Sequence, residues 1–333
     1  MKNIFLEKDI LVTGGCGSIG SEIVRQLVKF KPKRIRVFDN NESAQFHLSQ
    51  ELKGESIRHL IGDIRDKERI MRACRGVDYV FHAAALKHVP LCEYNPYEAV
   101  RTNVIGTQNL IGACIELGIE KLLSIGTDKS VNPINTMGAT KLLSEKLVTS
   151  SYGDMELKTA GVRFGNVLNS DGSVIPIFKK QIKNGGPVTV TSPEMTRFFM
   201  SIDEAVGLVL KSMHLMKGME IFILKMHSLK IIDLAQAMID ELSSQYGYKS
   251  NDINIKIMGS RPGEKIGECL ITKEETTHLK ETEDMYILKK PIITPQTTKE
   301  YRSTKKYEKY DSASTKLLSI NEIKKQLYSN GII

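Results

Sequence analysis

Three consecutive residues, Thr127, Asp128 and Lys129, carry side chains that can exchange protons with a substrate. A carboxyl group serves as an acid and an amine as a base when each is in its neutral form, whereas an adjacent ion pair favours both charged forms. Burial would oppose that attraction, so we expect a coupled pair in which neither pKa belongs to one residue alone. The alternative interpretation is a turn at the end of a strand, capped by an ion pair on the surface.

A glycine-rich turn, TGGCGSIG at 13–20, offers a second kind of chemistry, the binding of phosphate. It lies between an apolar run and a helical pattern, where glycines allow a tight turn, close approach of a pyrophosphate and close packing of helix on strand. The start of the helix adds free N–H groups that attract an anion. The predicted contacts with the pyrophosphate are Gly14, Gly17, Ser18, Ile19 and Gly20.

Asp39 closes the next apolar run, 19 positions after Gly20, and is placed to accept hydrogen bonds from the ribose hydroxyls of a dinucleotide. Its carboxylate would repel a 2′-phosphate, so NAD is favoured over NADP as the cofactor. A turn aspartate without this role is the alternative for Asp39 alone. Further cofactor contacts are predicted after the second, third and fourth strands, at Asn40, Asp63, Ile64 and Ala83.

The elements that must position these residues alternate between short β-branched runs and helical patterns, which is typical of a parallel sheet with helices on both faces. The predicted fold class is α/β, a Rossmann-like doubly wound parallel sheet with a smaller α/β substrate lobe. Strands are expected at 9–13, 34–38, 57–61, 77–83, 121–125 and 159–164, and helices at 18–30, 97–117 and 137–150.

After about residue 166 the alternation becomes irregular, which predicts the second lobe. Its expected strands are 188–191, 220–225 and 253–258, and its expected helices are 203–216 and 231–245. The predicted domains are an NAD-binding domain at 1–165, a substrate-binding lobe at 166–295 that can interleave with it, and a polar, lysine-rich tail at 296–333. The tail is expected to wrap a lobe or a neighbouring subunit, or to be partly mobile.

Composition excludes several classes of protein. Lys and Arg exceed Asp and Glu by 47 to 39, but the basic residues are dispersed and no nucleic-acid-binding signature accompanies them, so no nucleic-acid partner is expected. No apolar run approaches the roughly 20 residues that span a bilayer, and the N-terminus does not read as a signal peptide, so we expect a cytoplasmic protein without membrane contact. Five scattered cysteines without a CxxC pair predict reduced thiols and no metal site.

Together these motifs resemble the extended short-chain dehydrogenase/reductase family. The residues that carry the resemblance are TGGxGxxG, the aspartate after the second strand, GDIRD, HAAALKHVP and a lysine on the helix after the fifth strand. HAAALKHVP, TDKSVNPINTMGATK, RFGNV, MTRFFMS and RPGEK are similar to the UDP-N-acetylglucosamine 4,6-dehydratases of deoxyamino-sugar pathways. The resemblance covers about residues 8 to 290, and larger members carry N-terminal membrane helices that this chain is expected to lack.

The resemblance implies a reaction in which hydride passes from sugar C4 to a tightly bound NAD and returns to C6, so that the cofactor is recycled. It assigns Lys129 as the base at C5 and Asp128 as the acid at C6. Most of the superfamily uses Tyr-x-x-x-Lys, whereas this chain has Met137 four residues before Lys141. Because methionine cannot transfer a proton, Thr127 is the candidate base at C4, relaying to Lys141 or water. A methionine here also occurs in part of the dehydratase family.

The resemblance also implies contacts with the cofactor and the substrate. Asn103 resembles a cofactor-side asparagine, with a satisfied amide on a helix face as the alternative, and Lys87 can reach the substrate pyrophosphate. Each of the remaining contacts can also be read as a surface group. They are predicted for the diphosphate and nucleotide at Asn166, Thr191, Arg197, Arg261 and Glu264.

Two other functions remain open from sequence alone. A UDP-sugar 4-epimerase on the same fold would need no acid–base pair at C5 and C6, and a non-catalytic nucleotide-sensing protein would explain the missing tyrosine. Within the dehydratases, DNNE at 39–42 resembles the branch that retains the C5 configuration, whereas the chain length is common in the inverting branch; retention is favoured. Short-chain dehydrogenases usually pair through helices, so a homo-oligomer is expected.

Overall fold

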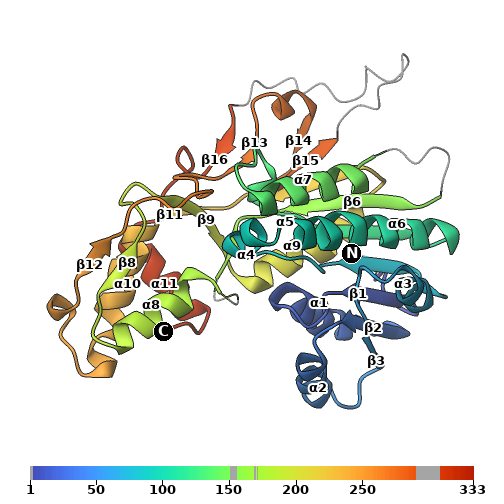
Figure 1. Cartoon of the computed structure of the whole chain (residues 1–333), viewed down its shortest axis with the longest axis horizontal. Coiled ribbons are helices and arrows are strands. Elements are labelled where there is room, and N and C mark those ends of the chain that lie inside the picture. The colour runs from blue at the N-terminus through green and yellow to red at the C-terminus, as the bar shows by residue number, and fades with distance from the viewer. Residues whose placement is uncertain (1–2, 151–155, 169, 171, 290–307) are drawn as a thin grey trace.

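The computed structural model describes residues 3–150, 156–168, 170, 172–289 and 308–333. In this part of the chain a nine-stranded sheet forms the larger lobe (Figure 1). Its strand order is β14-β15-β10-β6-β5-β4-β1-β2-β3, and the seven strands from β10 to β3 run parallel. The first six strands along the chain are β1 (Asp9–Thr13), β2 (Arg34–Asp39), β3 (Ile57–Ile61), β4 (Tyr79–His82), β5 (Lys121–Ile125) and β6 (Lys158–Arg163).

Helices cover both faces of this sheet, which confirms the doubly wound α/β class. The central strands β1 and β4 are buried along their whole length, as expected for parallel strands covered on both sides. On one face α1 packs against α9, and on the other α6 packs against α3 and α7. These helices are α1 (Ser18–Val28), α3 (Lys67–Cys74), α6 (Gly106–Glu116), α7 (Thr136–Val148) and α9 (Ile202–Leu215), while α2 (Glu42–Glu51) lies beside β2 and β3.

The helix expected at 97–117 is interrupted near its start. A short helix, α5 (Pro96–Ala99), leads into a π-helical turn, η1 (Val100–Ile105), before α6 begins. A π-helical turn of this kind often accompanies a functional site. Here it carries Asn103 into the interior, where the side chain is buried.

One strand lies in a different lobe from the one predicted. The strand expected at 220–225 forms β10 (Glu220–Leu224), which pairs in parallel with β6 in the central sheet rather than joining the second lobe. The antiparallel strands β15 (Met285–Lys289) and β14 (Leu279–Glu281) then extend the sheet beyond β10. The chain therefore returns to the larger lobe after residue 166, because the open edge of β6 accepts an apolar strand from far along the sequence.

The smaller lobe is a helical layer with a short parallel strand pair. Strands β8 (Val188–Val190) and β12 (Ile255–Ile257) pair beside α8 (Val174–Lys183) and α10 (Ile231–Leu242), and their side chains form a separate apolar core. The last helix, α11 (Ile320–Ser329), packs against α10, so the described part of the tail returns to this lobe (Figure 1). Residues 296–307 of the predicted tail lie outside the described residues.

The remaining short elements join the two lobes. Strand β9 (Thr196–Met200) lies between β11 (Ser228–Lys230) and β7 (Asn166–Val167), and β13 (Cys269–Ile271) pairs with β16 (Tyr310–Asp311). All five cysteines are free thiols. Among the described helices, none combines the length and the apolar character needed to cross a bilayer.

Candidate active site

Two adjoining cavities open at the carboxyl ends of the parallel strands. One has a volume of about 540 Å³ and extends from the glycine-rich turn to the ends of β5 and β6. The other, of about 420 Å³, extends from the same turn along the ends of β2 and β3. Gly14 and Ala83 line both, so the two form one elongated site across the point where the strand order reverses between β1 and β4. Doubly wound sheets bind ligands at this point.

Two glycines of the turn, Gly14 and Gly20, have no room for a side chain. A Cβ atom on Gly20 would lie 2.0 Å from the Gly14 carbonyl oxygen, and one on Gly14, whose φ is +64°, would lie 2.5 Å from the Ala84 nitrogen. The Asp39 carboxylate accepts hydrogen bonds from the backbone N–H groups of Cys16 at 3.0 Å and Asn41 at 2.9 Å. The turn is thus held against the end of β2 with its backbone open to a pyrophosphate.

These cavities fit a dinucleotide and bring together eleven of the predicted cofactor residues. The Asp63 carboxylate is paired with the Arg65 guanidinium at 2.6 Å, and hydrogen bonds from Arg65 lower the pKa of Asp63. The Asp63 carboxyl group, which lines the second cavity, therefore stays ionised and paired with Arg65. The predicted cofactor residues that line the two cavities are Gly14, Gly17, Ser18, Ile19, Gly20, Asp39, Asn40, Asp63, Ile64, Ala83 and Lys141.

Asn103 does not line either cavity, and its contact with the cofactor stays a prediction. Its side-chain oxygen accepts a hydrogen bond from the Leu86 N–H at 2.8 Å, and its amide nitrogen donates to the Leu86 carbonyl and the Thr140 hydroxyl, each at 3.0 Å. These three hydrogen bonds fix the segment after β4 against α7. The alternative of a satisfied amide on a helix face is the one the structure supports.

The Thr127–Lys129 segment follows β5 directly, and Thr127 and Lys129 line the larger cavity. Asp128 is completely buried behind them. Its Oδ1 accepts a hydrogen bond from the Thr127 hydroxyl at 2.9 Å and one from the Lys129 Nζ at 3.0 Å, and its Oδ2 is buried without a hydrogen-bond partner. The three side chains therefore form one connected proton network, not a surface ion pair.

Opposing effects act on the Lys129 amine. Burial lowers the pKa of Lys129, but the carboxylates of Asp128 and Glu268 outweigh it despite the nearby Arg197, and the pKa is raised above its ordinary value. The resting protein therefore holds Lys129 as an ammonium. A role as base requires that this amine first lose its proton.

Met137 and Lys141 lie on the cavity-facing side of α7, as their spacing predicts. The Lys141 Nζ donates to the Ile125 carbonyl at 2.6 Å, and burial lowers the pKa of Lys141 to about 8. Met137 packs in a small apolar cluster with Cys92 and Ala99. Met137 itself supplies no proton donor in place of a tyrosine hydroxyl. The described hydrogen bonds of the Thr127 hydroxyl are with the Asp128 carboxylate and the Lys129 backbone N–H, not with Lys141.

The predicted substrate residues divide into three groups. Lys87 and Asn166 line the larger cavity, and the Asn166 side-chain oxygen is buried without a hydrogen-bond partner. Thr191 donates from its hydroxyl to Glu264 at 3.3 Å, and Arg261 is exposed on the same turn as Glu264. Thr191, Arg261 and Glu264 do not line the two cavities. The turn that carries Arg261 and Glu264 is held to α7 by a hydrogen bond from the Asn135 side chain to the Gly263 carbonyl at 2.8 Å.

Arg197 is buried and lines neither cavity, and its contact with the nucleotide stays a prediction. Its guanidinium donates to the carbonyls of Thr196, Lys265 and Ile266 at 2.8 to 3.0 Å. Arginine at this position therefore fixes the course of the RPGEK segment beneath the site. A guanidinium has five N–H donors, so these three hydrogen bonds use only part of them.

A family model described as polysaccharide biosynthesis protein matches residues 10–290. The chain belongs to this family. It is 42% identical over 294 residues, 87% of this chain and 85% of the relative, to a Campylobacter jejuni protein named UDP-N-acetylglucosamine 4,6-dehydratase (inverting). It is 37% identical over 337 residues, 97% of this chain and 96% of the relative, to a Rickettsia rickettsii protein named UDP-glucose 4-epimerase. The solved structure of Pen from Bacillus thuringiensis is 41% identical, covers 99% of both chains and superposes with a TM-score of 0.92.

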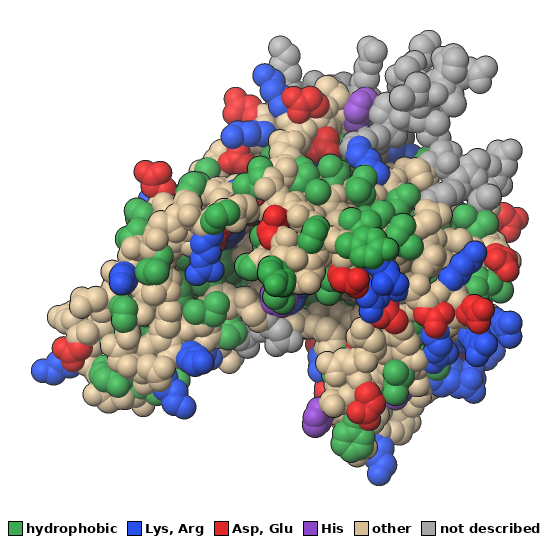
Figure 2. Space-filling model, viewed as in Figure 1, with side chains coloured by type: hydrophobic (Ala, Val, Ile, Leu, Met, Phe, Trp, Pro, Cys, Tyr) green, Lys and Arg blue, Asp and Glu red, His purple; other side chains and the backbone are tan. Residues whose placement is uncertain are grey.

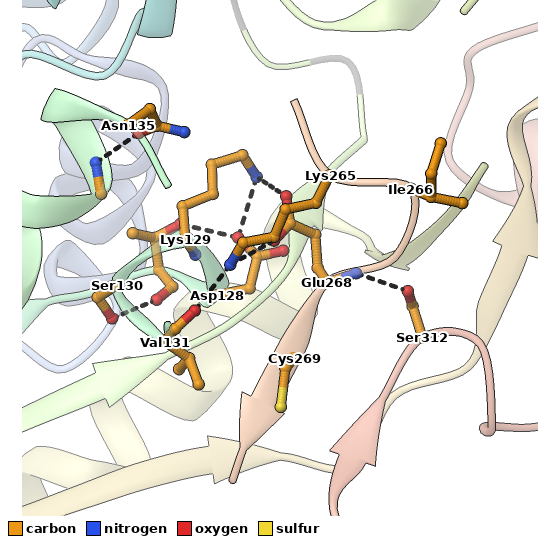
Figure 3. Close-up of polar contacts among 12 residues, drawn as sticks. Asp128, Lys129, Ser130, Val131, Asn135, Lys265, Ile266, Glu268, Cys269 and Ser312 are labelled. Carbon is orange, nitrogen blue, oxygen red and sulfur yellow. Dashed lines mark hydrogen bonds and ion pairs between the residues drawn. The ribbon is translucent and has the colours of Figure 1, made fainter. Parts of the chain in front are cut away.

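In this member of the polysaccharide biosynthesis family, the sequence interpretation missed Glu268. Its carboxylate lies 3.6 Å from the Lys129 Nζ and 3.6 Å from the Lys265 Nζ, and the side chain is 3% exposed (Figure 3). Glu268 follows the RPGEK motif by three positions, but no periodicity connects it with Lys129, which lies in the turn after β5. The contact exists only because the two lobes pack together.

Proposed function

We propose that the protein is a UDP-N-acetylglucosamine 4,6-dehydratase that uses a bound nicotinamide dinucleotide, NAD in preference to NADP. The observation that carries the proposal is the Thr127–Asp128–Lys129 network at the wall of a cavity that begins at the glycine-rich turn. A reaction confined to C4 needs no acid–base pair at C5 and C6, so it would give the Asp128–Lys129 pair no chemical role. The Campylobacter relative supports the same substrate and reaction.

The hydrogen bonds suggest how the protein's own groups would handle the protons. The Thr127 hydroxyl lies at the cavity and donates to Asp128 Oδ1, so it can accept the proton of the sugar C4 hydroxyl while passing its own to the carboxylate. The residues around the glycine-rich turn would hold the nicotinamide dinucleotide, which would supply the hydride-transfer chemistry needed at C4 and C6. Asp128, now a carboxylic acid, is the group that protonates the departing C6 hydroxyl, and the atoms of that hydroxyl leave as water.

Lys129 takes the C5 proton in this account and returns a proton to C5 after the elimination. Neutralising Asp128 removes one of the two carboxylates that hold the Lys129 proton, so the relay through Thr127 also prepares the amine to act as a base. Lys141 lies beside the same cavity and would hold the cofactor ribose. Met137 contributes an apolar wall.

Incubation of the purified protein with UDP-N-acetylglucosamine and NAD tests the proposal. We expect a product that has lost one water and carries a 4-keto and a 6-deoxy group, detected by mass spectrometry and proton NMR. Retention at C5 is our prediction from the 39–42 segment, and inversion, as in the name of the Campylobacter relative, is the alternative. The ring couplings at C5 distinguish the two.

A UDP-sugar 4-epimerase is the second candidate, favoured by the identity to the Rickettsia relative over nearly the whole chain. It would convert the same substrate into its C4 epimer without loss of mass. Recovery of UDP-N-acetylgalactosamine alone would establish the epimerase in place of the dehydratase. Absence of turnover with either NAD or NADP would favour the nucleotide-sensing protein.

A further inference from the structure

Glu268 is the one acidic side chain in the described part of the chain that meets both Lys129 and Lys265. It lies just before β13, and Figure 3 shows the side chains of both lysines pointing toward its carboxylate. Its Oε1 faces Lys129 and its Oε2 faces Lys265, each at 3.6 Å. Lys265 is fixed separately, because its Nζ donates to the Val131 carbonyl at 2.7 Å.

The backbone of Glu268 is held by the segment that follows residue 307. Its N–H donates to the Ser312 hydroxyl at 3.0 Å, and the Ser312 N–H donates to its carbonyl at 2.9 Å. Ser312 is fully buried, and its hydroxyl also lies 2.8 Å from that of Thr196. Burying the charge of the Glu268 carboxylate costs free energy of folding. We therefore expect this side chain to have a role in the site.

The carboxylates on either side of Lys129 each retain an unused oxygen. Asp128 Oδ2 and Glu268 Oε2 are both buried without a hydrogen-bond partner. The charged groups facing the Lys129 amine are Asp128, Glu268 and, with the opposite sign, Arg197; Lys265 reaches it only through Glu268. When Asp128 gains a proton during the reaction, Glu268 is the remaining carboxylate within reach of the amine.

We propose that Glu268 is a positioning residue that holds Lys129 and receives its excess proton, which leaves Lys129 as a neutral amine for the C5 proton. The inference rests on the proposed dehydration. In this step an N–H bond of Lys129 breaks and an O–H bond forms on Glu268, so an ion pair becomes a neutral pair. Burial favours the neutral pair. After C5 has been reprotonated, Lys129 takes its proton back from Glu268.

Steady-state kinetics of Glu268→Gln between pH 6.5 and 9.5 test this assignment. We expect kcat to fall by roughly a hundredfold at pH 7, as for loss of general-base assistance, with KM little changed. Activity should rise with pH, because solvent then removes the Lys129 proton, whereas the wild type should change little over this range. Glu268→Asp keeps a carboxylate and should keep the flat profile at a lower kcat. A uniform loss at every pH, or no loss, would overturn the proposal.

A second readout does not depend on turnover. Competitive labelling with acetic anhydride at a series of pH values, followed by peptide mass spectrometry, reports the pKa of the Lys129 amine. Removing the charge of Glu268 should lower this pKa, and the midpoint should match the rise of kcat in Glu268→Gln. An unchanged midpoint would overturn the proposal even if the wild type made no dehydrated product.

Glu220→Gln is the matched control for loss of a buried carboxylate. Glu220 pairs with Lys289 at 3.3 Å and is 4% exposed, but it lies on β10 outside both cavities. This variant should leave the Lys129 midpoint and the pH profile of kcat unchanged. A shift of the midpoint equal to that of Glu268→Gln would show a general effect of charge and would also overturn the proposal.

Discussion

The two lysines of the site, Lys129 and Lys141, have pKa values that are shifted in opposite directions. Lys129 lies between two carboxylates and is held as an ammonium, whereas Lys141 lies where burial dominates and its pKa falls to about 8. The difference follows from their neighbours, since the Lys141 Nζ donates to a backbone carbonyl and not to a carboxylate. Of two lysines twelve positions apart, Lys129 thus holds its proton firmly, whereas Lys141 is still mostly protonated at pH 7 and releases its proton near pH 8.

Lys141→Met should make the protein more stable at pH 7 and remove its activity. The unfolded chain holds the Lys141 proton up to about pH 10.5, but the folded chain releases it near pH 8. Folding therefore costs up to roughly 3 kcal/mol below pH 8, and this cost disappears as the pH rises towards 10.5.

Chemical denaturation of wild type and Lys141→Met at pH 7, 8.5 and 10 measures the effect. The stability difference should be largest at pH 7 and should shrink above pH 8. Lys67→Met, which removes an exposed lysine from α3, controls for the loss of one positive charge. A difference that grows with pH would contradict the assigned direction of the Lys141 pKa.

At the scale of single residues, the sequence predicted what depends on neighbours in the chain. Asp128 and Lys129 are adjacent, and their coupling follows from that adjacency. For Asn103 and Arg197, the sequence does not show that carbonyls elsewhere in the chain accept hydrogen bonds from their side chains. Glu268 was missed for the same reason, since its contact with Lys129 depends on how the second lobe packs.

At the scale of elements, the turn between β1 and α1 sets how close the cofactor can come. The helix packs so closely that Gly20 contacts the Gly14 carbonyl, and any side chain would force the two apart. This unit is local in sequence, and its glycine spacing predicted it. The place of β10 was not predictable in the same way, because a strand's own residues do not show which sheet edge it joins.

Gly20→Ala should destabilise the fold and weaken dinucleotide binding. Its Cβ would lie 2.0 Å from backbone, and forcing such a contact typically costs 1–3 kcal/mol. Thermal unfolding and equilibrium dialysis with NAD measure both effects. Gly112→Ala on α6 is the control, since a Cβ there meets nothing within 4 Å and alanine favours the helix. Equal behaviour of the two variants would refute the close approach.

At the scale of the whole molecule, the two lobes and the returning tail form the site together. The surface over the helices from α4 (Val89–Tyr94) to α7 carries exposed apolar side chains. Figure 2 shows these side chains gathered over the helices. Tyr94 and Tyr97 are 86% and 70% exposed, and Leu91, Ile105 and Leu143 are exposed nearby. Clusters of exposed apolar side chains are typical of protein–protein contacts. We expect a second copy of the chain to cover this cluster.

Light scattering coupled to size-exclusion chromatography tests this expectation. The wild type should elute as a dimer or a higher homo-oligomer, and Leu143→Glu should shift the mass toward the monomer. Ile177→Glu is the control, because Ile177 is comparably exposed on α8 of the smaller lobe. A wild type that is monomeric at micromolar concentration would contradict the expectation.

The central claim, that Lys129 serves as the base at C5 in a dehydration, is tested most directly by solvent exchange. Wild type and Lys129→Met are incubated with UDP-N-acetylglucosamine and NAD in deuterated water, and the position of deuterium is read by NMR. The wild type should give a 4-keto-6-deoxy product with deuterium at C5 and the hydrogen from C4 retained at C6, whereas Lys129→Met should give none. A product with no deuterium at C5, or a Lys129→Met variant as active as the wild type, would contradict the account.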